Sequence, residues 1–195
     1  MNDFVGTQLR GWDAATFRTA AGDPTMRSTV VALTIFESTP DWSRLRGRFE
    51  RLTLCVPALR MRPLYGALGL SAPRMAVDPD FDLDVHLRRY RLAHGAGWRD
   101  LLDDARRMSV TDFDHDRPLW EAALVEGLPD GQCALLLKLH HSIADGQATV
   151  AMGLALFEFG PEPDPNEAPA PAPPAAEDVT VREVTYANLA DELRR

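Results

Sequence analysis

The stretch Leu135-Leu136-Leu137-Lys138-Leu139-His140-His141-Ser142-Ile143-Ala144-Asp145-Gly146 decides the fold, because it changes abruptly from apolar to polar residues. The apolar run is too short to cross a membrane and predicts a buried strand. After Gly146, apolar residues recur at helical spacing, which predicts a helix. The two histidines therefore stand where a strand passes into a helix, and α/β proteins often carry their catalytic residues at such positions.

The spacing of the polar residues suggests separate roles for the two histidines. Successive strand side chains point to opposite faces, so His140 and His141 cannot both face one cavity if the strand is regular. We expect one to support the structure and the other to act, since an imidazole suits the removal of a proton from a hydroxyl or thiol. Asp145 can fix a cation or cap the following helix, and Gly146 allows a close approach of backbone or ligand.

The histidine pair could also serve without any catalytic role. Histidines at a strand end often form only part of a polar rim. A metal site is disfavoured, because adjacent strand positions diverge and no cluster of Cys and His stands at ligand spacing. Ser142 is disfavoured as a nucleophile, because no G-x-S-x-G motif surrounds it. We therefore predict no metal site here.

The pattern H-H-x-x-x-D-G resembles the signature of the acyl-CoA-dependent acyltransferases with a chloramphenicol-acetyltransferase-like fold. Within that group the sequence is most similar to the bacterial wax ester synthase/diacylglycerol acyltransferase family. The resemblance covers nearly all of this chain but only about the first half of the family. It also rests on Arg117-Pro118-Leu119-Trp120-Glu121, on the turn Gly127-Leu128-Pro129-Asp130-Gly131, on Asp13-Ala14-Ala15-Thr16-Phe17 and on Ile35-Phe36-Glu37.

The resemblance implies an α/β fold with a mixed sheet backed by helices, like the N-terminal lobe of the chloramphenicol-acetyltransferase-like fold. It implies that His141 is the catalytic base, while His140, Asp145 and Gly146 keep the site in shape. The implied reaction transfers a fatty acyl group from acyl-CoA to diacylglycerol or a long-chain alcohol. Acyl-CoA is then a co-substrate, and no cofactor is expected. Besides acyl-CoA and a lipid alcohol, the expected partner is a C-terminal lobe or a second copy of the chain.

Two other function classes remain open. One is a truncated half-protein that binds acyl chains or a partner lobe without turnover, which the shortness of the chain favours. The other is a condensation-type enzyme that uses carrier-protein thioesters. The Pro118-Leu119-Trp120-Glu121 run favours the lipid acyltransferase over this second class, by resemblance alone.

Composition narrows the class of protein. The 195 residues are 45% hydrophobic, which is enough for a substantial core. The net charge of −8 argues against general nucleic-acid binding. Cys55 and Cys133 lie in apolar segments, so we expect buried free thiols in a reducing compartment. The sequence shows no signal peptide or membrane span, and we expect a cytoplasmic protein with at most peripheral contact to membranes or lipid droplets.

Hydrophobic periodicity predicts the remaining elements. Residues 80–88 alternate and predict a strand with His86 at its surface. Helical spacing of Trp98, Leu101, Leu102, Ala105 and Met108 predicts core positions. We further expect a helix at 12–20 with Trp12, Ala15 and Phe17 on its apolar side, a strand at 28–37, a helix from 40 to about 55, a hairpin of 119–126 with 132–140, and a helix from 146 to about 159.

Arginines and prolines mark two further features. Arg44, Arg48 and Arg51 share one face of the helix that begins near residue 40. Together with Arg60 and Arg62 they could bind phosphate, but we expect these arginines simply to face solvent. His115 is expected in a loop.

Seven of the seventeen residues 161–177 are proline, which predicts an extended linker. We predict an acyltransferase lobe at 1–160, a Pro/Ala-rich linker at 161–178, and a short helical tail at 179–195 that begins a second lobe.

Overall fold

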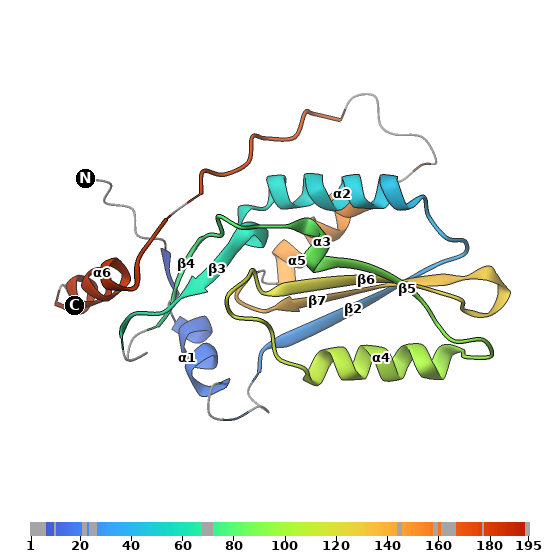
Figure 1. Cartoon of the computed structure of the whole chain (residues 1–195), viewed down its shortest axis with the longest axis horizontal. Helices are drawn as coiled ribbons and strands as arrows, with labels where there is room; N and C mark the ends of the chain where they lie inside the picture. Colours follow the sequence, from blue (N-terminus) through green and yellow to red (C-terminus); the bar gives the residue numbers. More distant parts are fainter. Residues whose placement is uncertain are drawn as a thin grey trace.

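The computed structural model of the chain has helices on both faces of a four-stranded sheet, with a smaller sheet beside it (Figure 1). This arrangement confirms the predicted α/β fold with a mixed sheet. Within the described part of the chain, no helix is long and apolar enough to cross a membrane. The structure describes residues 7–9, 11–20, 23, 27–67, 72–143, 146–157, 160, 167–176 and 178–193.

The main sheet has the strand order β2-β7-β6-β5. β7 runs antiparallel to both of its neighbours, and β5 runs parallel to β6, so the sheet is mixed. The predicted hairpin is confirmed, with Trp120 opposite Leu139 and Val125 opposite Ala134. The strands are β2 (Thr29–Phe36), β5 (Leu87–Arg91), β6 (Trp120–Glu126) and β7 (Cys133–His140).

Both faces of the two central strands are buried, which explains their nearly continuous apolar sequences. α2 (Trp42–Cys55), α5 (Gly146–Leu156) and the short α3 (Leu83–His86) lie on one face, and α4 (Trp98–Val110) lies on the other (Figure 1). Asp41 caps the start of α2 by accepting a hydrogen bond from the backbone of Arg44. The α2 face buries Leu45, Phe49, Leu52, Trp120, Leu124 and Leu135, and the α4 face buries Leu101, Ala123, Val125, Ala134 and Leu136.

A smaller antiparallel sheet has the order β1-β4-β3. α6 docks beside it through Arg74, which pairs with Asp191 at 2.8 Å, and through Val184, which is fully buried. Residues 167–176 form no helix or strand and run along the outside of α2 (Figure 1). The division into lobe, linker and tail stays a prediction. The additional elements are β1 (Thr7–Gln8), β3 (Met61–Leu64), β4 (Arg74–Val77), α1 (Gly11–Ala20), α6 (Val181–Leu193) and the 3-10 turns Pro57–Arg60 and Pro129–Gly131.

The prediction of one strand across residues 80–88 is wrong. Asp82 accepts a hydrogen bond from the backbone of Asp84 and starts a single turn of helix, α3, and the strand begins only at Leu87. The helical turn breaks the two-residue alternation. As a result His86, predicted at the surface, is only 3% exposed.

Several side chains that were predicted to be buried are exposed, because the buried face of each helix is narrower than its apolar pattern suggests. In α4, Leu101 is fully buried, but Trp98 and Leu102 are 40% and 59% exposed. Cys133 is buried, whereas Cys55 at the end of α2 is exposed; both thiols are free. α1 buries Phe17 and exposes Ala15, and the side chain of Trp12 lies outside the described residues. α5 ends at Leu156, three residues earlier than predicted.

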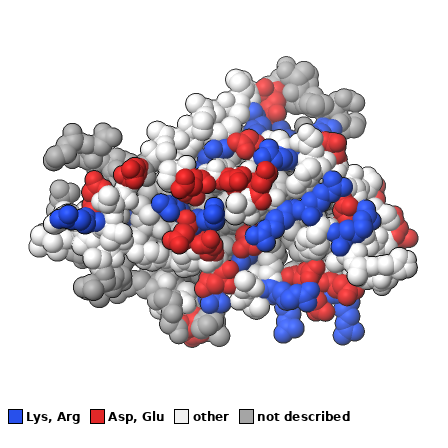
Figure 2. Space-filling model, in the orientation of Figure 1, with Lys and Arg blue, Asp and Glu red and all other residues white. Residues whose placement is uncertain are grey.

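The arginines on α2 are not simply solvated. Arg48 donates to the carbonyls of Ala155 and Leu156 at the end of α5, and it pairs with Glu167. Arg51 pairs with the same carboxylate at 2.9 Å. The expectation of a solvated face is therefore wrong for these two residues, which fasten α5 and the 167–176 segment to α2. Basic and acidic groups interleave on the visible face in Figure 2, in keeping with such pairing.

Candidate functional site

The backbone fixes both histidines at the end of β7. The N–H of His140 donates to the carbonyl of Leu119 at 3.0 Å, and the N–H of His141 donates to the carbonyl of Ser28 at 2.8 Å. The N–H of Ile143 donates to the carbonyl of His140 at 3.0 Å and closes the turn that follows. Gly146 is the first residue of α5. Asp145 lies outside the described residues, so its predicted supporting role has no geometry here.

His140 is the inward-facing histidine and is 6% exposed. Its ring lies 4.6 Å from the ring of Phe17 and 6.0 Å from that of Phe113, measured between centroids. Its Nδ1 atom accepts a hydrogen bond from the backbone N–H of Ser142 at 3.1 Å, and the Ser142 hydroxyl lies 2.7 Å from the same atom. A backbone N–H can only donate, so the neutral ring carries its proton on Nε2. The His140 ring is thus fixed in orientation and in tautomer.

His141 is the outward-facing histidine. It directly follows the strand and its side chain is exposed. The structure therefore separates the two rings in the way that strand alternation predicts. An imidazole with a fixed backbone and an accessible side chain can reach a hydroxyl group bound against this end of the sheet. The assignment of His141 as the base and of His140 as its support stays a prediction.

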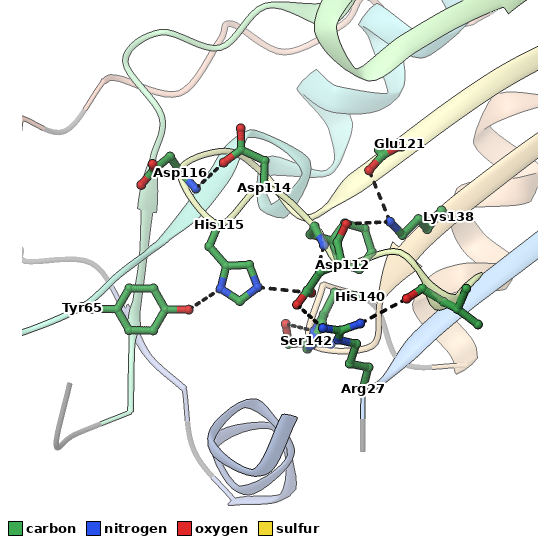
Figure 3. A network of polar contacts seen from close by, with 12 residues as sticks. Arg27, Tyr65, Asp112, Asp114, His115, Asp116, Glu121, Lys138, His140 and Ser142 are labelled. Atoms are coloured by element: carbon green, nitrogen blue, oxygen red, sulfur yellow. Dashed lines mark hydrogen bonds and ion pairs between the residues drawn. The ribbon is translucent and has the colours of Figure 1, made fainter. Parts of the chain in front are cut away.

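A polar network lies beside His140 (Figure 3). Arg27 precedes β2 and pairs with Asp112 at 2.9 Å, and it also donates to the carbonyl of Val110 at 3.1 Å. On the far side of Asp112, the His115 Nε2 atom lies 3.6 Å from the carboxylate. The Tyr65 hydroxyl lies 2.6 Å from the His115 Nδ1 atom. His115 is thus in a loop, as predicted, but that loop is tied to β2 and to the segment after β3.

The tyrosine in this network stays protonated. Burial, together with the negative charges of Asp112 and Asp116, raises the pKa of Tyr65 to about 12. The phenol can therefore donate to the Nδ1 atom of His115. In that arrangement the proton of the neutral His115 ring is on Nε2, the nitrogen that faces Asp112.

The same network extends to Lys138, two residues before His140 on the same face of β7. Its side chain is fully buried, and its Nζ atom lies 3.3 Å from Glu121 Oε1. Sequence reasoning missed Lys138, Arg27 and Tyr65 as members of the site. A signal was present for Lys138 alone, because it is the one lysine in the sequence and interrupts an apolar strand.

Within the run Arg117-Pro118-Leu119-Trp120-Glu121, Trp120 makes the contacts that hold this segment in the core. The indole N–H donates to the carbonyl of Leu59 at 2.8 Å, and the ring stacks on Phe49 at 5.9 Å and on His86 at 4.8 Å. His86 in turn hydrogen-bonds through Nδ1 to the Trp120 carbonyl at 2.8 Å. Within the described residues, the buried His86 Nε2 atom has no hydrogen-bond partner. Trp120 therefore anchors the start of β6 in the core.

Cavities are small near the histidines. A cavity of about 30 Å³ lies against His140, with Arg27, Asp112 and His115 in its wall. A cavity of about 250 Å³ is lined by Phe36 at the opposite end of β2, away from the histidine pair. Among the described residues, no group of three or more His, Cys, Asp or Glu side chains could hold a metal ion.

Comparison with known proteins places this geometry in a family. Residues 9–195 match the sequence model of the wax ester synthase/diacylglycerol acyltransferase catalytic domain. A Mycobacterium tuberculosis protein named as a diacylglycerol O-acyltransferase is 42% identical over 136 residues, which span 70% of this chain and 28% of that protein. The chain thus spans well under two thirds of such relatives.

Two solved structures share the fold. The wax ester synthase/diacylglycerol acyltransferase from Marinobacter aquaeolei VT8 superposes with a TM-score of 0.62 at 25% identity, over 85% of this chain and 41% of that one. The first condensation domain of the calcium-dependent antibiotic synthetase superposes with a TM-score of 0.64 at 21% identity, over 98% of this chain and 44% of that one. The second likeness shows the fold alone.

Proposed function

Since the chain belongs to the wax ester synthase/diacylglycerol acyltransferase catalytic-domain family, we propose that it carries the histidine-bearing part of an O-acyltransferase site. The reaction is transfer of a fatty acyl group from acyl-CoA to diacylglycerol or a long-chain alcohol. One observation carries this proposal: His141 is exposed at the end of β7, on a backbone held by hydrogen bonds to both neighbouring segments.

In this reaction the same base transfers a proton twice. Neutral His141 removes the proton of the acceptor hydroxyl while the oxygen attacks the thioester carbonyl. When the tetrahedral intermediate collapses, the carbon–sulfur bond breaks and the imidazolium returns the proton to the departing CoA thiolate. Acyl-CoA is the co-substrate in this scheme. No cofactor and no covalent acyl-enzyme take part.

Apolar side chains are exposed on β2 and on the helix that follows His141 in the chain, and exposed apolar side chains suit a lipid substrate. Val30, the cross-strand partner of Leu139, is 44% exposed. α5 begins five residues after His141 and exposes Val150 and Leu154 by 64% and 58%. We propose that acyl chains or a second lobe cover these apolar side chains. That lobe comes from a longer protein, a partner chain or a second copy.

The test is acyl transfer from radiolabelled acyl-CoA to diacylglycerol and to hexadecanol. The chain is assayed alone and with the C-terminal part of the Mycobacterium tuberculosis relative supplied in trans. We expect weak turnover alone and higher turnover with the added lobe. His141→Ala should lower the rate about 100-fold or more, the usual size of a general-base effect. His94→Ala, which removes another exposed histidine, is the matched control and should keep the wild-type rate. Normal turnover by folded His141→Ala would refute the assignment.

A second candidate is a half-protein that binds acyl-CoA or a partner lobe without turnover. The observation that favours it is the exposure of apolar side chains on α5, Val150 by 64% and Leu154 by 58%, which can bind an acyl chain or a lobe without any chemistry. Binding of acyl-CoA in calorimetry, with no product in the presence of the added lobe, would establish it. We also propose that any membrane or lipid-droplet contact is peripheral, so that salt or carbonate releases the protein.

A further inference from the structure

We propose that Lys138 is a positioning residue for the site, holding His140 in the one orientation and tautomer that present His141 correctly. This inference rests on the proposed function only where it predicts a rate. The part that concerns structure, namely that a buried ammonium group holds the His140 ring in place, does not depend on any activity.

The first observation is the placement of the charge. Lys138 lies on the central strand β7, and its side chain is fully buried. Its cross-strand partner is Glu121, and the ammonium lies 3.3 Å from that carboxylate. Removing an ammonium from water is costly, and the attraction of one half-buried carboxylate offsets that cost only in part. An apolar residue would fill this strand position without the cost, so stability alone does not account for the buried ammonium.

The second observation is what the ammonium touches. Besides Glu121, it donates to the carbonyl of Asp112 at 3.3 Å and lies 4.0 Å from the centre of the Phe113 ring. Both contacts belong to the loop between α4 and β6. The three partners use the donor directions of the ammonium, two by hydrogen bonds and one by a cation–π contact. Lys138 therefore fastens this loop to the face of β7 that also carries His140.

The third observation connects the loop to the histidine. The Phe113 ring meets the His140 ring edge-on, with centroids 6.0 Å apart and planes at 69°. The Phe17 ring also contacts the His140 ring, with centroids 4.6 Å apart. In contact with both rings, His140 keeps its Nδ1 atom aimed at the backbone N–H of Ser142. That hydrogen bond spans His141, so a rotation of the His140 ring would move the turn and the exposed imidazole with it.

Other contacts also hold the loop in place. Asp112 near its start is paired with Arg27, and His115 at its middle is bonded to Tyr65 (Figure 3). Lys138 is the point at which this polar network reaches β7. Its contacts with the Asp112 carbonyl and the Phe113 ring link the loop to the strand that carries His140.

The test removes the buried ion pair of Lys138 and Glu121. The variant Lys138→Met/Glu121→Gln removes both charges together, so that no unpaired carboxylate is left in the fold. Arg107→Met, which breaks an exposed pair with Asp104 on α4, is the matched control. The first readout is the ¹⁵N spectrum of the His140 ring in the 195-residue chain. We expect one Nε2–H tautomer in the wild type and in the control, and averaged tautomers in the double variant.

The second readout is acyl transfer with the added C-terminal part. We expect the double variant to lower kcat about 10-fold or more with an unchanged KM for acyl-CoA, since small displacements of a catalytic group can cost about 100-fold. Lys138→Arg keeps the charge and should restore much of the rate. A purely structural residue would move neither the tautomer nor kcat of the folded protein.

Each outcome decides the question. A folded double variant with the wild-type His140 spectrum overturns the proposal. If the double variant does not fold, Phe113→Leu breaks the link between Lys138 and His140 while sparing the ion pair, and an unchanged His140 spectrum there overturns it equally. If wild-type chain with the added lobe shows no acyl transfer, the proposed function fails, and the spectra alone then decide the role of Lys138.

Discussion

Trp120 offers the sharpest test of how the start of β6 is anchored. The change is Trp120→Phe, which keeps an aromatic ring but removes the indole N–H. In the wild type that N–H donates to the carbonyl of Leu59, and Trp120 is 1% exposed. The substitution leaves a buried carbonyl without its donor and a gap where the indole was. Stacking on Phe49 and His86 is partly retained.

The expected loss of stability follows from these contacts. A buried acceptor that loses its donor costs about 1–3 kcal/mol. The missing ring atoms add about 1 kcal/mol of lost burial. The sum is about 2–4 kcal/mol for Trp120→Phe. Trp120→Ala would cost about 3–5 kcal/mol or more, and would unfold a domain near the lower end of the usual range of about 5–15 kcal/mol. The phenylalanine variant is therefore the measurable one.

Urea unfolding followed by far-ultraviolet circular dichroism gives the measurement. With a slope of about 2 kcal/mol per molar urea, the midpoint should fall by about 1–2 M while the slope stays constant. Trp98→Phe is the matched control, because Trp98 is 40% exposed, and it should change stability by no more than about 0.5 kcal/mol. Equal effects of the two substitutions would refute the account of Trp120 as an anchor.

Two further predictions concern other buried groups. Burial lowers the pKa of His86, so the contribution of this residue to stability is fully present above the unfolded-state pKa of about 6.5 and is lost as the pH falls below this value. From about pH 7 to about pH 5, the urea midpoint should therefore fall more in the wild type than in His86→Phe. Equal falls in the two proteins would contradict this. Arg48→Met should speed amide hydrogen exchange at the end of α5 and at residue 167, because Arg48 donates to the last carbonyls of α5 and to Glu167, whereas Arg46→Met, in an exposed pair with Asp84, should leave both segments unchanged.

The sequence predicts the central hairpin well, because β6 and β7 are governed by local rules. Their apolar runs are bounded by Pro129-Asp130-Gly131, and Asp130 and Gly131 adopt positive φ angles of 58° and 75° in the turn. Strand alternation then separates His140 from His141 without knowledge of any tertiary contact. That the two rings do not share one environment could therefore be predicted, and the structure confirms it, since His140 is buried and His141 is exposed.

The failures arise where long-range contacts override local pattern. Residues 80–88 alternate well enough for a strand, but the cap at Asp82 and the stacking of His86 on Trp120 favour a turn of helix there. Arg27 and Tyr65 are far apart in sequence and meet through Asp112 and His115, so no spacing rule could join them. Lys138 was visible as an oddity, but its purpose depends on a loop that only the fold places above it.

The chemistry of the site is therefore tied to a turn at the other end of the hairpin. A slip of one residue between β6 and β7 would move every side chain of β7 to the opposite face. Lys138 and His140 would then point to the side of the sheet that α2 and α5 cover, and the contacts of Lys138 with Asp112 and Phe113 and of His140 with Phe113 would be lost. In a hairpin the turn sets the register, and the connection between β6 and β7 contains Gly127, Asp130 and Gly131, all with positive φ angles. The turn that joins β6 and β7 thus helps to fix which side of the sheet each histidine faces.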